Sequence, residues 1–234
     1  MNELAQSSGF SGHNVEGGFD VDRVRQDFPI LGRQVHGKPL VYFDSGASAQ
    51  KPRAVIDAMT EVLEAQYTNV HRGAHYLSQT LTDRYEGVRE KIAAFLNAPS
   101  ENEIVITRNT TEAINLVAAT YGRKFLNKGD GVLISDMEHH ANIVPWQLLR
   151  DEIGIELKVA PIDDRGVLDM DAYAALLDGN TKLVAMTHCS NVLGTMLPGK
   201  EIVRLAHERG IPVLLDGSQA VVHSAVDVQD LNAR

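Results

Sequence analysis

Residues 211–220 read Ile-Pro-Val-Leu-Leu-Asp-Gly-Ser-Gln-Ala, a short apolar run that ends in a carboxylate and a glycine turn. Apolar residues without alternation are typical of a parallel strand covered on both faces, and ligands bind just beyond the carboxyl ends of such strands. Asp216 stands at that end, where its negative charge can hold a proton on the ring nitrogen of a cofactor. Gln219 follows three residues later and can reach the same ligand. The competing interpretation is that Asp216 caps the following helix, and the upstream sequence weighs against it.

Length and composition are those of an ordinary globular protein. The chain has 234 residues, 44% of them hydrophobic and 23% charged, which suffices for one large domain or a domain and a half. A net charge of -9 without a basic run argues against nucleic acid as a partner. A single cysteine, Cys189, excludes an internal disulfide framework and fits a reducing compartment. Because no apolar run approaches the roughly 20 residues of a membrane helix and no signal-peptide pattern opens the chain, we expect no membrane contact and a cytoplasmic protein.

The order of sequence patterns predicts the fold class. Residues 1–19 are rich in Ser, Gly and Asn, and we expect a disordered tail there. Further on, apolar runs alternate with helical patterns, which predicts an α/β fold with a mostly parallel sheet covered by helices. The expected strands are residues 40–43, 103–107, 131–135, 156–160, 183–187 and 213–216. The expected helices are residues 20–27, 52–63, 81–95, 111–119, 169–177 and 201–209, with another near Trp146.

Polar side chains follow several of these strands. Thr110 and Thr111 open a helix, where hydroxyls and free backbone N–H groups make a phosphate cradle; the alternative is an ordinary capping threonine. His139 can stack on a flat ring or bind a metal. Stacking is the better interpretation, since no helical histidine pair completes a metal site. Asn191 can donate to a phenolate-like oxygen of a bound ring.

Two loops before the sheet are weaker candidates. Ala47 lies in a run of small residues, 44–49, that allows close backbone approach to a ligand or forms a simple turn. His71 and Arg72 lie in an unpatterned polar segment that lines a cleft or is merely solvated. Cys189 adjoins a core strand, and a small buried hydrophobe is a better interpretation of it than a nucleophile.

Four strings in this order resemble one family. They are Arg-Asn-Thr-Thr-Glu-Ala-Ile-Asn at 108–115, Met-Glu-His-His-Ala-Asn-Ile-Val-Pro-Trp-Gln at 137–147, Thr-His-Cys-Ser-Asn-Val-Leu-Gly-Thr at 187–195 and Asp-Gly-Ser-Gln-Ala at 216–220. Together they closely resemble the pyridoxal-phosphate-dependent cysteine desulfurases of the class V aminotransferase family. The His-His-Ala-Asn-Ile-Val-Pro-Trp string resembles the sulfur-mobilisation (SUF) branch.

The resemblance implies a fold and a role for each candidate. The fold would be the large domain of a fold type I transferase that depends on pyridoxal 5'-phosphate (PLP). Thr110 and Thr111 would bind the cofactor phosphate, His139 would stack on the ring as a catalytic residue, and Asp216 would keep the ring nitrogen protonated. Asn191 and Gln219 would contact the ring's phenolic oxygen. Ala47, His71 and Arg72 would line the substrate cleft.

The resemblance also implies an activity. Such an enzyme converts L-cysteine to L-alanine and leaves a protein-bound persulfide for iron–sulfur cluster assembly, usually as a homodimer that passes sulfur to a small acceptor protein. We expect residues 20–234 to hold an amino-terminal segment and most of the PLP-binding domain. The family's Schiff-base lysine, persulfide cysteine, substrate-binding arginine and small C-terminal domain would lie beyond residue 234.

Several alternatives remain open at this stage. A selenocysteine lyase shares the cradle, and a truncated, non-catalytic fragment would bind cofactor weakly or pair with a complete subunit. Lys158, Lys182 and Lys200 lie in the wrong sequence context to replace the family's lysine. Position 218 is Ser where the family commonly has Ala, a change from which we expect only a mild effect.

Overall fold

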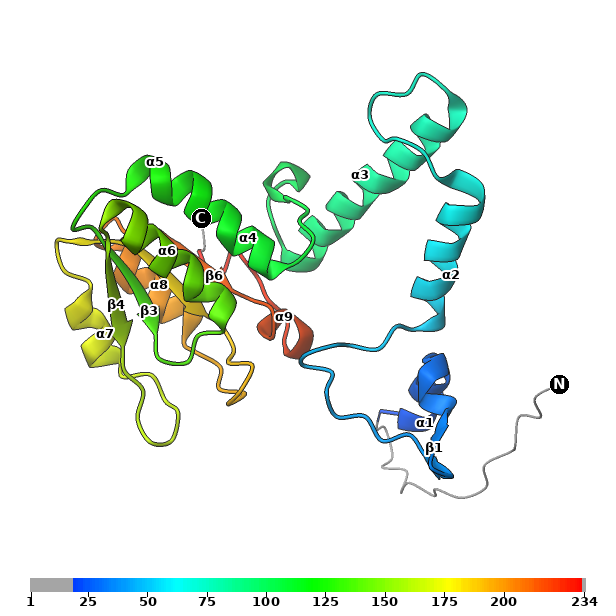
Figure 1. Ribbon diagram of the computed structural model, residues 1–234, viewed down its shortest axis with the longest axis horizontal. Helices are drawn as coiled ribbons and strands as arrows, with labels where there is room; N and C mark the ends of the chain where they lie inside the picture. The colour runs from blue at the N-terminus through cyan, green and yellow to red at the C-terminus, as the bar shows by residue number, and fades with distance from the viewer. Residues whose placement is uncertain (1–18, 233–234) are drawn as a thin grey trace. The chain divides into compact units, whose positions relative to one another are not determined.

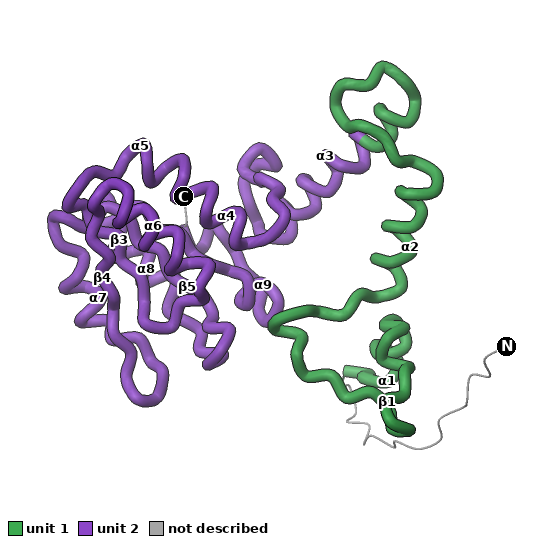
Figure 2. The backbone as a smooth tube through the Cα atoms, in the orientation of Figure 1, with its two compact units in different colours: residues 1–81 green, residues 82–234 purple. Residues whose placement is uncertain are grey.

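A computed structural model describes residues 19–232 of the chain (Figure 1). The chain forms two compact units, residues 1–81 and residues 82–234 (Figure 2). The tail predicted for residues 1–19 lies outside the described residues, except for Phe19.

The first unit consists of short local elements. Helix α1 (Val21–Gln26) begins where Asp20 Oδ1 accepts a hydrogen bond of 2.9 Å from Arg23 N, and the 3-10 turn η1 (Pro29–Gly32) follows. Strands β1 (Gln34–Val35) and β2 (Lys38–Pro39) form a hairpin whose turn residues, His36 and Gly37, both have positive φ, as tight hairpins require. Helix α2 (Arg53–Glu61) continues into the π-helical turn η2 (Val62–Gln66), and α3 (Tyr76–Leu96) leads into the second unit.

The second unit is built on a four-stranded parallel sheet, which confirms the predicted fold class. Its strands are β3 (Gly131–Ser135), β4 (Glu156–Ala160), β5 (Thr181–Thr187) and β6 (Val213–Asp216), in the order β4-β3-β5-β6. Every neighbouring pair is parallel, so all carboxyl ends lie along one edge of the sheet.

Helices complete the second unit. They are α4 (Thr110–Val117), α5 (Arg123–Phe125), α6 (Val144–Ile153), α7 (Met170–Leu176), α8 (Gly199–His207) and α9 (Ala220–His223), with the 3-10 turns η3 (Glu101–Glu103) and η5 (His140–Asn142) and the π-helical turn η4 (Ala118–Gly122). Asp169 caps α7 by accepting from Asp171 N and Ala172 N, as capping chemistry predicts. Among the described residues, no helix is both long and apolar enough to cross a membrane.

Alternate residues of the central strands face two separate hydrophobic cores. Leu133 of β3 joins a core with α7 and α8, whereas Val132 and Ile134 join another with α4 and α6 (Figure 1). Trp146 and Tyr173, both fully buried, are the largest side chains of the two cores. Because both faces of the sheet are covered at its centre, residues 132–134 of β3 and 183–186 of β5 are apolar without alternation, whereas the edge strand β4 is only partly buried.

Two predicted strands are absent. Residues 40–43 and 104–107 have no strand partner in the part of the chain that the structure describes, and residue 103 ends the turn η3. An apolar run becomes a strand only where another strand accepts its backbone hydrogen bonds. Without that partner, Val41, Phe43 and Val105 remain 71%, 97% and 72% exposed. The strand predictions at 40–43 and 103–107 were therefore wrong.

Candidate functional site

The candidate site lies at the carboxyl edge of the sheet. Thr187, the last residue of β5, is the register partner of Asp216, the last residue of β6, and His188 N donates to Asp216 O at 2.8 Å. Asp216 is 7% exposed. Two neighbouring strands therefore deliver a nearly buried carboxylate to the edge where parallel sheets bind ligands.

The Asp216 carboxylate uses one oxygen locally and leaves the other available. Oδ1 accepts from Ser218 N at 3.0 Å and from Ser218 Oγ at 2.5 Å. Oδ2 accepts no hydrogen bond from any residue that the structure describes. Among the described residues, Arg89 Nε is the only side-chain nitrogen or oxygen that is both fully buried and without a hydrogen-bond partner. Asp216 Oδ2 has no partner among these residues, so it must be accessible to solvent or to a ligand. Asp216 does not cap α9, whose N-cap position is Gln219.

The start of α4 presents unused backbone donors. Asn109, not a threonine, caps this helix: its Oδ1 accepts from Glu112 N at 2.9 Å, while Glu112 Oε2 accepts from Arg108 N at 2.6 Å. The neighbouring Arg108 side chain lowers the pKa of Glu112 by hydrogen bonding to its carboxylate. Within the described residues, nothing accepts from the N–H groups of Thr110 and Thr111. Both residues are exposed, so these donors can bind an anion.

One hydroxyl joins these two parts of the site. Ser218 Oγ lies 2.9 Å from Thr110 Oγ1 and 2.5 Å from Asp216 Oδ1. The structure thus brings Thr110 and Asp216 to either side of one serine, although 106 positions separate them in the sequence (216 minus 110).

His139 follows β3 at the same edge. Its Nδ1 accepts from Ala141 N at 3.1 Å, which fixes the ring at the start of η5. A neutral imidazole that accepts at Nδ1 carries its proton on Nε2. The ring is exposed and meets His140 edge-on, with 5.8 Å between the ring centroids.

Glu138 was not identified from the sequence, although it supports this edge. Its Oε1 accepts from Ser135 Oγ at 2.5 Å and from Thr187 N at 2.9 Å, and its Oε2 accepts from Asn142 Nδ2 at 2.7 Å. Burial raises the pKa of this carboxyl group, against the opposing effect of these donors. An acidic residue three positions after the buried strand β3 was the available signal.

Asn191 and Gln219 lie on segments that leave the same edge. Ser190, which is 2% exposed, accepts at Oγ from Val192 N and Leu193 N, and this turn holds Asn191 in an exposed loop after β5. Gln219 occupies the start of α9, directly after the Asp216 turn.

The cleft candidates belong to the first unit. Ala47 N donates to Asp44 O in an exposed turn that Tyr42 closes by donating to Ser48 O at 2.6 Å. His71 has a positive φ of 70°, which is unusual for a residue other than glycine. Arg72 next to it is exposed.

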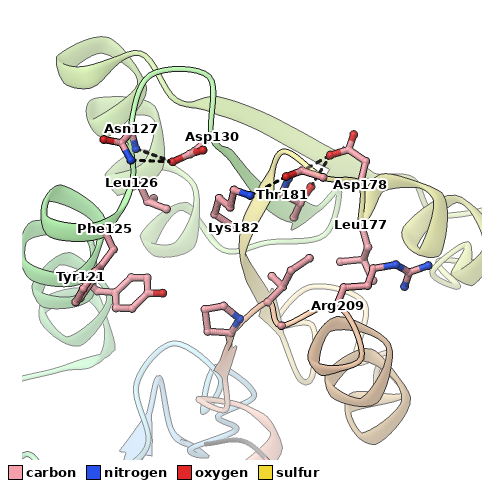
Figure 3. Close-up of a pocket in the computed structure, with 14 residues that line it drawn as sticks. Tyr121, Phe125, Leu126, Asn127, Asp130, Leu177, Asp178, Thr181, Lys182 and Arg209 are labelled. Carbon is pink, nitrogen blue, oxygen red and sulfur yellow. Dashed lines mark hydrogen bonds between the residues drawn. The ribbon is translucent and has the colours of Figure 1, made fainter.

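The three lysines considered in the sequence analysis form ion pairs or hydrogen bonds away from the candidate site. Lys158 pairs with Asp178 at 2.6 Å, Lys182 donates to Gly179 O at 2.7 Å, and Lys200 pairs with Asp230. Lys182 and Asp178 line a cavity of about 610 Å³ at the start of β5, together with Tyr121 and Arg209 (Figure 3). This cavity lies at the amino edge of the sheet, so it is distinct from the site around Asp216. Among the described residues, no group of His, Cys, Asp or Glu side chains is arranged to hold a metal ion.

Comparisons with known proteins identify the family. A family model for class-V aminotransferases matches residues 41–233. A cysteine desulfurase of Yersinia pestis is 54% identical over 213 residues, which are 91% of this chain and 52% of that protein. Among solved structures, cysteine desulfurases from Escherichia coli and Thermococcus onnurineus are both 37% identical, with TM-scores of 0.79 and 0.83, and the match covers 92% and 91% of this chain but 53% and 51% of theirs.

The match covers most of this chain and only part of its relatives. The chain spans about half the length of the Yersinia pestis relative and of both solved structures. The family model, by contrast, matches far more than half of the chain. This chain therefore belongs to the class-V aminotransferase family.

Proposed function

We propose that the chain carries the cofactor-binding part of a PLP-dependent cysteine desulfurase, which converts L-cysteine to L-alanine and leaves a protein-bound persulfide for iron–sulfur cluster assembly. One observation carries the proposal. The site contains both an available acceptor, Asp216 Oδ2, and two available donors, the N–H groups of Thr110 and Thr111, and Ser218 connects the two parts by hydrogen bonds. A relative that is 54% identical bears the name cysteine desulfurase, which supports this choice of activity.

The donor set fits an aromatic cofactor that bears a phosphate. Backbone N–H groups at the start of α4 bind the phosphate, and the helix dipole favours the negative charge there. Asp216 Oδ2 would accept a hydrogen bond from the protonated ring nitrogen, and its negative charge would keep that nitrogen protonated. PLP, when bound, supplies an electron sink for bond cleavage at the amino acid.

The remaining residues orient the ring and the substrate. His139 stacks on the ring and moves a proton at Nε2 during the reaction. Asn191 and Gln219 donate to the ring's phenolic oxygen, while Ala47, His71 and Arg72 line the entrance for L-cysteine. These roles agree with the exposed positions of His139 and Asn191 at the carboxyl edge of the sheet.

The proposal includes the setting of the reaction. The protein works as a homodimer in the cytoplasm and hands sulfur to a small acceptor protein. The single cysteine of the chain, Cys189, supports a reducing compartment. The Cys189 side chain is 5% exposed, and its backbone forms an isolated antiparallel β-bridge with Met196. We therefore assign Cys189 no part in sulfur transfer.

The test uses the protein expressed at the full length of its gene. We expect it to bind PLP, seen as visible absorbance that survives desalting, and to release alanine from L-cysteine. Asp216→Ala should abolish alanine formation and leave the far-ultraviolet circular dichroism unchanged. Ser224→Ala is the matched control, because Ser224 Oγ donates only to Ala220 O on α9.

Three outcomes would contradict the proposal. Alanine formation that persists in Asp216→Ala would exclude the role of this carboxylate. A folded wild-type protein that retains no PLP would exclude the whole function. Selenide release from L-selenocysteine, if much faster than sulfide release from L-cysteine, would assign the same site to a selenocysteine lyase instead.

A further inference from the structure

We propose that Ser218 is a positioning residue that couples the phosphate end of the cofactor site to its ring-nitrogen end. The inference rests on the proposed function, because it concerns how the same site holds PLP. Its physical basis is the single hydroxyl that lies within hydrogen-bond distance of both Thr110 Oγ1 and Asp216 Oδ1, at 2.9 and 2.5 Å.

The donors and acceptors fix the direction of this bridge. An ionised carboxylate only accepts, so the one proton of Ser218 Oγ goes to Asp216 Oδ1. Ser218 Oγ then serves Thr110 as an acceptor, and the proton of the Thr110 hydroxyl points to Ser218. The result is a directed chain from Thr110 through Ser218 to Asp216, whose last hydrogen bond is charge-assisted and therefore the stronger one.

This direction changes what Thr110 can do for a phosphate. While its hydroxyl proton is committed to Ser218, Thr110 offers an anion its backbone N–H and not its hydroxyl. Thr111, whose hydroxyl makes no hydrogen bond to a described side chain, supplies the side-chain donor. The bridge therefore divides the work between the two threonines.

The same chain fixes the Asp216 carboxylate. Ser218 donates to Oδ1 twice, from its backbone N and its hydroxyl, so the carboxylate cannot rotate without losing both bonds. The position of Oδ2, which accepts no hydrogen bond from a described residue, is fixed as a result. Preorganised acceptors bind a proton-bearing ring better because no ordering remains to be done on binding. Alanine at position 218 would keep the backbone bond and lose the hydroxyl that reaches Thr110.

The first experiment measures the bridge without cofactor. A double-mutant cycle combines Ser218→Ala with Thr110→Val and follows urea unfolding of the cofactor-free protein. If the two side chains interact, each single variant should raise the unfolding equilibrium constant about three- to tenfold, and the double variant should be little less stable than either single variant. Strictly additive losses would overturn the bridge.

The second experiment measures its effect on PLP. Ser218→Ala in the full-length protein should raise the PLP dissociation constant about tenfold and shift the visible absorbance of the bound cofactor, because the charge that faces the ring nitrogen is less well fixed. Ser218→Thr keeps the hydroxyl and should restore both values, whereas Ser224→Ala should change neither. An unchanged dissociation constant and spectrum in Ser218→Ala would overturn the inference.

The two experiments separate this inference from the proposed function. A wild-type protein that binds no PLP would overturn the function and the cofactor role of Ser218, while the cycle on cofactor-free protein would still report whether the bridge exists. Wild-type PLP binding combined with an unaffected Ser218→Ala variant would overturn the inference alone.

Discussion

Glu138 Oε1 accepts a hydrogen bond of 2.9 Å from the backbone N of Thr187, 49 residues further along the chain. The contact joins the end of β3 to the end of β5 at the edge that carries Asp216. Asn142 extends it, because its Nδ2 donates both to Glu138 Oε2 and to Ala185 O, and its Oδ1 accepts from Trp146 Nε1 at 3.0 Å. The candidate site is therefore supported from within by a buried polar network.

Glu138→Gln should destabilise the protein although the two side chains have the same shape. Every group around the carboxylate donates, and an amide replaces one of its acceptors with a donor that would face Asn142 Nδ2. Asn142 cannot turn over without losing its bonds to Ala185 O and Trp146 Nε1. We expect a loss of about 1–3 kcal/mol for the unsatisfied donors, measured by urea unfolding. Glu103→Gln, at an exposed turn, is the control, and equal stability of both variants would contradict the network.

His188 should make the fold less stable in mild acid. It is 9% exposed, and burial lowers its pKa from the ordinary value. Its folded pKa then lies below its unfolded one, so between the two the unfolded chain binds the proton and the folded chain does not. Its contribution is thus fully present above the unfolded pKa of about 6.5 and is lost as the pH falls toward the folded value. Urea unfolding at pH 7.5 and pH 5.5 should show a smaller loss of stability in His188→Leu than in the wild type, and parallel curves would contradict this.

The sheet could be predicted from the sequence because its local signals and its tertiary environment agree. Residues 131–135 are a run with three apolar residues at its centre, residues 156–160 alternate polar and apolar side chains from Glu156 to Val159, and both became strands over the predicted residues. Residues 104–107 carry the same local signal without a partner strand, and they stayed irregular. Whether a run pairs depends on a remote segment, and no local pattern contains that information.

The candidate site, too, could be predicted only in part from the sequence. Asp216 ends β6 and Thr110 opens α4, as the strand and helix patterns predict. The Ser218 bridge and the Glu138 network were missed, because both depend on contacts between residues far apart in the sequence, 108 positions for Ser218 and Thr110 and 49 for Glu138 and Thr187. The sequence pattern shows which residues lie at the carboxyl ends of the strands. To predict their hydrogen-bond partners, one must also know the register in which the strands pair.

Tyr173→Phe should show what the Tyr173 hydroxyl contributes to stability in the core that contains Leu133, α7 and α8. Tyr173 is fully buried, and its hydroxyl donates to Ile202 O at 2.8 Å, which joins α7 to α8. Burial also raises the pKa of this phenol, so it stays protonated and can donate throughout the ordinary pH range. We expect Tyr173→Phe to lose about 1 kcal/mol of unfolding free energy. Tyr121→Phe should lose almost nothing, because no described residue bonds to the Tyr121 hydroxyl, and a similar loss in both would contradict the assignment.

Two glycines in helical segments should respond differently to substitution by alanine. Gly87 lies inside α3 with nothing within 4 Å of the position that a Cβ would take, so Gly87→Ala gains only the better helix propensity. That gain is about 1 kcal/mol. At Gly122, in η4, a Cβ would lie 2.7 Å from Cδ2 of Leu149, which is 3% exposed and therefore cannot move away freely.

Crowding of this kind costs about 1–3 kcal/mol, which cancels or exceeds the gain in propensity at Gly122. The difference in unfolding free energy between the two variants is the better test, because both gain the same helix propensity and that contribution cancels. We expect Gly87→Ala to raise the urea midpoint and Gly122→Ala to lower it or leave it unchanged. Adding Leu149→Val to Gly122→Ala should recover part of the loss, since it removes the atoms that the new methyl group meets. If both alanine variants raised the midpoint equally, the close approach of η4 to α6 would not exist in solution.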